Sequence, residues 1–379
     1  MSRLSQLGTA IARPGEMSFG YVEMLELPTG ITERMPVILA CGRSDGPTFW
    51  LTANIHGNEY TGLLAVQRAI TDHLAGALDR LRGMVVAVPS LNPAGLRVSR
   101  RQPYFDASTD PNRTFPTHKQ VEEEEAEEDP PTPYEQFSLR LFDEMCTSAN
   151  YLVDLHCAHF RSIPFTIRDR VLYRDDAQRA RVERLADQVD GLARAFGLPV
   201  VNEFSVKKYL KEQLHRSTGG AALNEAGIPS ITPELGASEF VDPAALRAAI
   251  AGIRNALIWA GMLDGEPERI DWIPQPQVDF PVRRESHPRA PAGGIAYVLR
   301  EPGEIVRAGD PIAELRDIWG RPVEAVGGDG LVRSEHDGWV IGLRGQVTVY
   351  RHASLATLAV RDDEPLVARW PDERKGMPA

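Results

Sequence analysis

Alternation of strand-like and helix-like segments between about residues 20 and 262 restricts the folds open to this chain. Short runs of β-branched and apolar residues are each followed by a stretch with helical periodicity. The predicted strands are Thr48–Ala53, Met84–Pro89, Tyr151–Leu155 and Ile228–Thr232, and the predicted helices are Tyr60–Leu74, Tyr134–Cys146, Asp175–Phe196 and Pro243–Met262. Such alternation is typical of an α/β domain with a mostly parallel or mixed sheet covered by helices.

The 379-residue chain is longer than one ordinary domain, and its sequence pattern changes towards the C-terminus. We expect an α/β domain over residues 1–265 and, in the proline-rich segment 266–290, a linker or crossover. Residues 291–379 contain short β-runs separated by glycine turns and predict a small all-β, barrel-like domain that resembles a biotinyl/lipoyl-type barrel. Its turn SEHDGWV has no lysine, so we expect no covalently attached carrier group.

Composition excludes several classes of function. The net charge of −11 gives the chain no general attraction for nucleic acid or anionic membranes. Three scattered cysteines do not suffice for a disulfide framework or a thiolate metal site. No signal peptide and no run of about 20 apolar residues is evident. We therefore expect a cytoplasmic protein with a small-molecule partner, and a homo-oligomer stays open. The acidic segment 122–129 predicts a solvated loop.

Two residues of metal-binding type stand directly after the first predicted strand. In WLTANIHGNEYTG, His56 and Glu59 follow the strand and precede the helix. Their spacing lets both side chains converge on one ion within a tight turn, and Gly57 lets the backbone bend between them. The spacing alone recurs by chance, so it needs a partner elsewhere in the chain.

A second set of metal-binding residues ends another predicted strand. In YLVDLHCAHF, Asp154 and His156 are two residues apart and therefore point to the same side. His156 would be the third ligand, and Asp154 the acceptor that orients a ligand imidazole. Two histidines, one carboxylate and a position left to water form the open arrangement of catalytic zinc. The alternatives are a merely packed His156 and a rival ligand, His159, in the following loop.

Arginines gather in the turn-rich segment LNPAGLRVSRRQPYFDASTDPNRTFP, which follows the second predicted strand. A guanidinium there can bind a carboxylate or stabilise an oxyanion beside a metal. Arg97 and Arg100 are expected to balance the acidic surface instead. Farther along, Glu234 ends the apolar run of GIPSITPEL, where partial desolvation would raise its pKa towards a value useful for proton transfer. A capping or surface glutamate is the alternative there.

Five motifs together indicate a family. HGNE, NPAG, DPNRTFP, DLH and PELG occur in the order found in the succinylglutamate desuccinylase/aspartoacylase family, which the chain resembles over roughly residues 45–262. That family belongs to the zinc carboxypeptidase superfamily, so the resemblance implies a zinc-carboxypeptidase-like fold. One departure is the proline in Asp110-Pro111-Asn112-Arg113, where the family often has leucine.

The resemblance also implies a reaction. One zinc ion per chain would be held by His56, Glu59 and His156, and Glu234 would be the general base that activates water. Zinc can lower the pKa of bound water to about 7. The expected function is therefore a zinc-dependent amide hydrolase, a deacylase that cleaves an N-acyl amino acid or a related small carboxylate.

Substrate contacts follow from the same resemblance. Asn112 and Arg113 would bind the substrate carboxylate, and Arg101 would polarise the scissile carbonyl, with the adjacent Arg100 as the alternative. Tyr209, in VKKYLKEQ, is the candidate for a tyrosine that closes over the substrate in some relatives. Two other functions stay open: a zinc carboxypeptidase acting on peptides, and a non-catalytic binding protein, whose signature would be a lost ligand or base.

Overall fold

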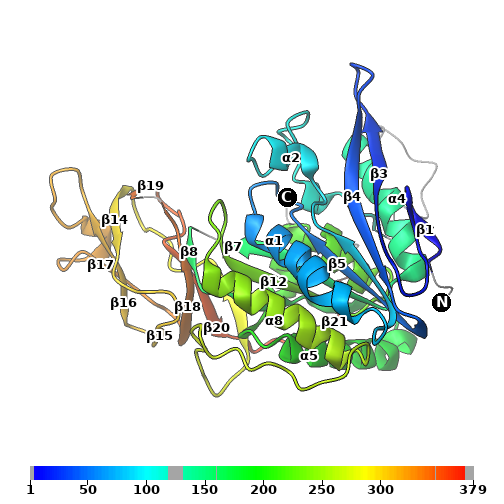
Figure 1. Cartoon of the computed structure of the whole chain (residues 1–379). Coiled ribbons are helices and arrows are strands. Elements are labelled where there is room, and N and C mark those ends of the chain that lie inside the picture. The colour runs from blue at the N-terminus through cyan, green and yellow to red at the C-terminus, as the bar shows by residue number, and fades with distance from the viewer. Residues whose placement is uncertain (1–3, 118–130, 159, 346, 372–379) are drawn as a thin grey trace.

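One mixed sheet organises the structure, which is a computed structural model describing residues 4–117, 131–158, 160–345 and 347–371. The acidic segment 122–129 and the rival ligand His159 lie outside the described residues. Within the described part, the sheet has 13 strands in the order β15-β18-β20-β13-β11-β9-β12-β7-β5-β6-β4-β3, with β8 added beside β18. The expected α/β class with a mixed sheet is confirmed (Figure 1).

Four parallel strands form the centre of this sheet. They are β5 (Ser44–Ala53), β6 (Arg82–Val88), β7 (Tyr151–Ala158) and β12 (Ser230–Ala237). Each corresponds to one of the apolar runs recognised in the sequence, because strands covered on both faces consist of almost continuous buried residues. The carboxyl ends of β5 and β7 lie side by side, with Ala53 paired with Leu155.

Antiparallel strands extend the centre on both sides. The hairpin of β3 (Met17–Glu26) and β4 (Thr32–Cys41) adds to β6 at one edge. On the other side β9 (Phe165–Arg168) runs antiparallel to β12 and parallel to β11 (Val200–Asn202). The sheet continues through β13 (Val282–Glu285), β20 (Ala356–Arg361), β18 (Gly338–Leu343) and β15 (Ile305–Val306).

Helices cover both faces of the central strands (Figure 1). The buried side chains of α1 (Tyr60–Arg68), α5 (Arg179–Phe196) and α8 (Pro243–Trp259) share one core with Phe49 and Leu51 of β5. Trp50, which points to the opposite face, packs in a second core with α4 (Pro133–Ser148). The alternation along β5 follows from the pleat of a strand, which sends successive side chains to opposite faces.

The C-terminal region contributes strands to three sheets, one of them the two-stranded pair of β21 with β10. Besides the strands that join the main sheet, it forms a four-stranded antiparallel sheet in the order β17-β16-β14-β19. Segment 266–290, expected as a linker or crossover, contains β13, which pairs with β11 and β20. This segment therefore connects the α/β part to the C-terminal strands through backbone pairing; the domain boundaries themselves stay a prediction.

Shorter elements complete the fold. They are β1 (Gln6–Leu7), β2 (Ala10–Ile11), α2 (Pro93–Arg97), β8 (Arg161–Ser162), β10 (Val171–Tyr173), α6 (Val206–Lys211), α7 (Thr218–Asn224), β14 (Gly294–Val298), β16 (Pro311–Arg316), β17 (Leu331–Arg333), β19 (Thr348–Val349) and β21 (Val367–Arg369). A π-helical turn over Ala69–Leu74 and several 3-10 turns join them. Within the described residues, no helix combines the length and the apolar character that a membrane span requires.

Candidate active site

The loop between β5 and α1 carries His56 and Glu59 and is held by a buried asparagine. The side chain of Asn54 donates hydrogen bonds to the carbonyl oxygens of His56 (3.1 Å) and Glu59 (2.9 Å). A Cβ atom at Gly57 would lie 2.1 Å from the carbonyl carbon of Gly95. Close packing therefore requires glycine here, whereas the sequence had suggested only a bend.

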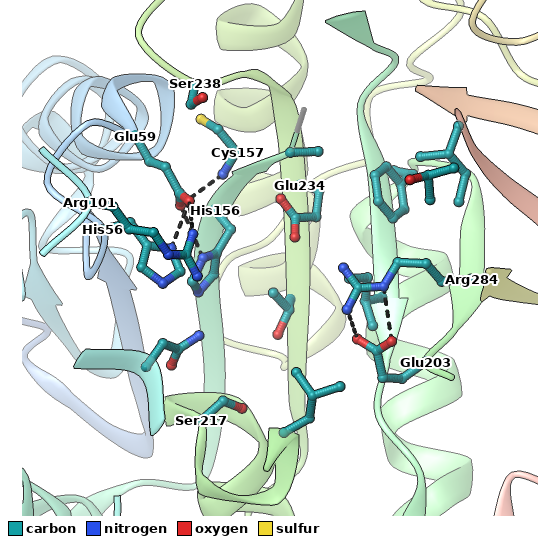
Figure 2. A pocket seen from close by; sticks show the side chains of 18 of the residues that line it. His56, Glu59, Arg101, His156, Cys157, Glu203, Ser217, Glu234, Ser238 and Arg284 are labelled. Carbon is teal, nitrogen blue, oxygen red and sulfur yellow. Dashed lines mark hydrogen bonds and ion pairs between the residues drawn. The ribbon is translucent and has the colours of Figure 1, made fainter. Parts of the chain in front are cut away.

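His56, Glu59 and His156 converge at the carboxyl ends of β5 and β7, as Figure 2 shows. Nδ1 of His56 lies 2.7 Å from Oε1 of Glu59, and Nδ1 of His156 lies 3.0 Å from Oε2 of the same carboxylate. Each of the three residues is only 3 % exposed. Two imidazoles and one carboxylate are a donor set that suits a divalent metal such as zinc.

Each imidazole of this cluster is held from behind by an aspartate. Nε2 of His156 lies 3.0 Å from Oδ2 of Asp154, as expected, and Nε2 of His56 lies 3.1 Å from Oδ1 of Asp110. The second oxygen of Asp154 accepts a hydrogen bond of 2.6 Å from the hydroxyl of Thr52. Because the aspartates engage the Nε2 atoms, both Nδ1 atoms remain directed towards a shared cation position.

The electrostatics of the cluster favour positive charge. Burial by itself lowers the pKa of His156, but the carboxylates of Asp154 and Glu59 raise this pKa well above its usual range. Burial by itself raises the pKa of Glu59. The imidazoles of His56 and His156 outweigh this effect of burial and lower the pKa of Glu59 overall. A site that stabilises both a protonated imidazole and an ionised carboxylate is one where a bound cation would also be favoured.

Glu234 faces the cluster from the neighbouring strand. It pairs in register with His156 in the parallel ladder of β12 and β7, and it lines the same pocket. Glu234 is 8 % exposed, and its Oε2 atom has no hydrogen-bond partner among the described residues. Burial, partly offset by the charge of His156, raises the pKa of Glu234. Such a carboxylate can exchange a proton with a ligand in the pocket.

Arg101 lies beside the cluster and lines the same pocket (Figure 2). Its Nη2 atom donates a 2.8 Å hydrogen bond to Oδ2 of Asp110, and its Nη1 atom lies 3.7 Å from Oε1 of Glu59. The guanidinium is 41 % exposed and so remains accessible to a ligand. Asp110 thus connects Arg101 to His56: Oδ2 accepts from Arg101, while Oδ1 contacts His56 and also accepts a 3.0 Å hydrogen bond from the backbone N–H of Asn112.

Asn112 and Arg113 line the same pocket. The amide oxygen of Asn112 accepts hydrogen bonds from the backbone N–H (2.9 Å) and the hydroxyl (3.1 Å) of Thr218. The Arg113 guanidinium donates to the carbonyl oxygens of Glu212 (2.7 Å) and Asn112 (2.6 Å), but forms no ion pair with any residue that the structure describes. Burial lowers the pKa of Arg113, so an anionic ligand would compensate its desolvated charge.

Tyr209 departs from the expectation for a substrate-closing residue. The side chain is fully buried in an apolar cluster with Leu172 and Leu214, and it is not among the residues that line the pocket. Its hydroxyl accepts a hydrogen bond of 3.2 Å from Asn224. Tyr209 is the one buried residue of the short helix α6, so it has a packing role in this structure.

The pocket has a volume of about 400 Å³ and reaches beyond Glu234 to residues that the sequence did not indicate. There Arg284 of β13 forms two hydrogen bonds with Glu203, at 2.9 and 2.6 Å (Figure 2). Asp169, directly after β9, lines the same region. Asp169 and Glu203 each follow a strand, a position that could have marked them, whereas Arg284 lies in the segment interpreted as a linker.

Comparison with known proteins shows a matching protein family and a similar deacetylase. The model of the succinylglutamate desuccinylase/aspartoacylase catalytic domain matches residues 45–260. An N-alpha-acetyl-L-2,4-diaminobutyric acid deacetylase from Halomonas elongata is 27 % identical over 319 residues, covering 84 % of this chain and 83 % of the relative. The family match includes the segments that carry the whole His56–Glu59–His156 cluster and Glu234.

Solved structures share the fold over nearly the full length. A succinylglutamate desuccinylase/aspartoacylase from Rhodobacter sphaeroides has a TM-score of 0.68 at 23 % identity, covering 92 % of this chain and 96 % of its own. The product-bound ectoine utilization protein EutE (DoeB) from Ruegeria pomeroyi has a TM-score of 0.66 at 21 % identity, covering 91 % and 95 %. With its catalytic-domain match spanning more than half of the sequence, this chain belongs to the succinylglutamate desuccinylase/aspartoacylase family of deacylases.

Proposed function

We propose that this chain is a zinc-dependent amide hydrolase that removes the acyl group from an N-acyl amino acid or a related small carboxylate. The observation that carries the proposal is the convergence of His56, Glu59 and His156 in one pocket with the partnerless Oε2 of Glu234. Family membership supports amide hydrolysis, since the matched catalytic domain is that of deacylases.

The residues of the cluster fit a zinc ion. Both Nδ1 atoms face the Glu59 carboxylate, and the aspartates behind the two imidazoles would keep these nitrogens unprotonated for a metal. When bound, zinc would supply Lewis-acid polarisation of the substrate carbonyl and activation of water. Three protein ligands would leave a coordination position for the reacting groups, which is the arrangement of catalytic sites.

The chain's own residues would carry out the remaining steps. Ionised Glu234 accepts a proton from the attacking water and later delivers it to the nitrogen of the leaving amine. Arg101, beside the cluster, donates hydrogen bonds to the carbonyl oxygen as this oxygen gains negative charge. Cleavage of the C–N bond releases a carboxylic acid and a free amine.

Arg113 would hold the substrate in place. Its guanidinium is half-buried and without an acidic partner among the described residues, so it is available for a substrate carboxylate, with Asn112 beside it. The pocket volume of about 400 Å³ supports a small metabolite over a long peptide. The similarity to a deacetylase of an N-acetylated amino acid supports the same substrate class.

A hydrolysis screen tests this proposal. The zinc-loaded protein should cleave N-acetyl, N-succinyl or N-formyl amino acids, and chelation should abolish the activity until zinc is restored. Faster cleavage of C-terminal residues from peptides would favour the carboxypeptidase alternative. Tight binding of N-acyl amino acids by the zinc-loaded protein without any turnover would favour a binding protein and contradict the proposal.

A further inference from the structure

A second group of potential metal ligands lies in the C-terminal region, outside the pocket of the candidate active site. His287, Glu335 and His336 each offer one ligand atom, and these atoms all lie within 4.8 Å of one another. The two imidazole rings are tilted by 59°, with their centres 5.0 Å apart. Within the part of the chain that the structure describes, only this group and the active-site cluster bring three His, Cys, Asp or Glu side chains so close together.

The backbone holds both sides of this group in place. His287 follows β13, and the carbonyl oxygen of the next residue, Pro288, accepts a 2.9 Å hydrogen bond from the backbone N–H of Leu355. His336 lies in the turn between β17 and β18, where the buried Ser334 hydroxyl donates to the His336 carbonyl oxygen (2.7 Å) and accepts from its N–H (3.2 Å). Little further ordering would therefore be needed for the two segments to bind one ion.

The ligand atoms are available to a metal. A backbone N–H can only donate, so the 3.2 Å hydrogen bond from the Glu335 N–H shows that Nε2 of His287 directs its lone pair at the turn. An ion at Nε2 would replace this long contact, and the N–H of the exposed Glu335 would turn to water. The Glu335 carboxylate and the His336 ring form no hydrogen bond or ion pair with any residue that the structure describes, so neither has to leave a partner.

We propose that His287, Glu335 and His336 bind a second zinc ion, which fastens the segment after β13 to the turn between β17 and β18. Two imidazoles and a carboxylate suit zinc, and water would complete the coordination. Modest side-chain rotations would bring the ligand atoms to the separation of about 3.4 Å that tetrahedral zinc sets. This site goes beyond the proposed deacylase function, because it lies outside the pocket and its role is structural.

Two features define what this zinc would do. Arg284, which lines the active-site pocket, lies three residues before His287, so the ion would stabilise the strand that carries this arginine. Glu335 is exposed and both histidines are only half-buried, whereas the active-site ligands are buried. Zinc should therefore bind here more weakly than at the active-site cluster, and dialysis against limiting zinc should empty this site first.

A zinc titration of the dialysed protein tests the proposal. In calorimetry, the wild-type chain should take up one zinc beyond its content after dialysis, and His336→Ala should take up none. Glu335→Gln, a conservative change of an exposed side chain, should lower the affinity for this zinc by at least about 10-fold, a loss seen even for groups that only orient a ligand. His73→Ala, which removes an exposed histidine elsewhere, should bind zinc as the parent does.

Thermal unfolding gives a second measurement. Zinc in excess should raise the Tm of the dialysed wild-type protein more than that of His336→Ala, because a ligand that binds only the folded state stabilises it. Neither measurement needs turnover, and the difference of one zinc between the two proteins is expected whether or not the chain proves to be a deacylase. No uptake by the wild-type protein beyond its dialysed content, or equal uptake by His336→Ala, would overturn the second site.

Discussion

Glu234 stands directly opposite His156 in the parallel pairing of β12 with β7, so both side chains emerge on the same side of the sheet. No hydrogen bond between the two side chains is needed to keep them together, because the backbone register does so. The proposed base is thus held next to a proposed zinc ligand by the sheet itself, while its Oε2 atom stays available to a ligand.

Replacing Glu234 tests its role as the base. Glu234→Gln is nearly isosteric but cannot accept a proton, and kcat should fall by about 10²–10⁴-fold. Zinc content and Tm should remain close to those of the parent, because the side chain contributes no hydrogen bond from Oε2. Steady-state kinetics with zinc-loaded protein measures the effect, and exposed Glu266→Gln is the matched control. A kcat near the parental value would remove Glu234 from the mechanism.

Asp110 should tune the metal affinity through His56. Asp110→Asn would weaken the contact that holds Nε2 of His56, and zinc affinity should fall by about 10–100-fold, as for other partners of metal ligands. Asp154→Asn should act similarly through His156. Competition with a chromophoric chelator measures the affinities, with exposed Asp271→Asn as the control. Unchanged zinc affinity in both variants would show that the aspartates do not support the ligands.

Arg113 should distinguish acidic from neutral substrates. Arg113→Ala should mainly raise KM for an N-acyl amino acid, and the effect should be much smaller for the matching carboxamide. Arg113→Lys should restore only part of the loss, because an ammonium lacks the two-pronged geometry of a guanidinium. The measurement is a comparison of kcat and KM for each acid and its amide. Equal effects on both substrates would assign Arg113 a purely structural role.

A buried ion pair should make the C-terminal region essential for stability. Arg170 and Asp362 are both fully buried at the side chain and lie 3.0 Å apart, and Asn202 donates to the same aspartate at 2.6 Å. Asp362→Ala would leave the Arg170 charge unpaired, at a cost of about 3–5 kcal/mol in the free energy of unfolding. Denaturant titration measures it, with the exposed neighbour Asp363→Ala as control. A loss below about 1 kcal/mol would contradict this estimate.

Local sequence patterns were sufficient for the centre of the fold. Each of the four parallel strands is a buried apolar run, and the helices between them have clear apolar faces. The pairing of β13 and β20 with the rest of the sheet was not predictable in this way. Such pairing joins segments far apart in the chain, and the proline-rich surroundings of β13 indicated a linker.

In the candidate site, too, local sequence patterns indicated some contacts, whereas contacts between distant segments were not predictable. The structure brings together His56, Glu59 and His156, because residues at the ends of neighbouring parallel strands meet at one edge; their binding of zinc stays a prediction. The role of Asp110 behind His56 depends on how a turn folds back over the β5–α1 loop, which spacing does not reveal. The burial of Tyr209 away from the pocket was not predictable, because its motif contains no sign of which helix face is buried.

Zinc binding by the His56–Glu59–His156 cluster is the claim on which the other conclusions depend. The direct measurement is the zinc content of purified wild-type protein and of His156→Ala, by elemental analysis after dialysis against buffer with limiting zinc. The wild-type chain should retain close to one zinc per chain, and His156→Ala should retain almost none while keeping its fold by circular dichroism. A folded His156→Ala variant that binds zinc as well as the parent would contradict the account.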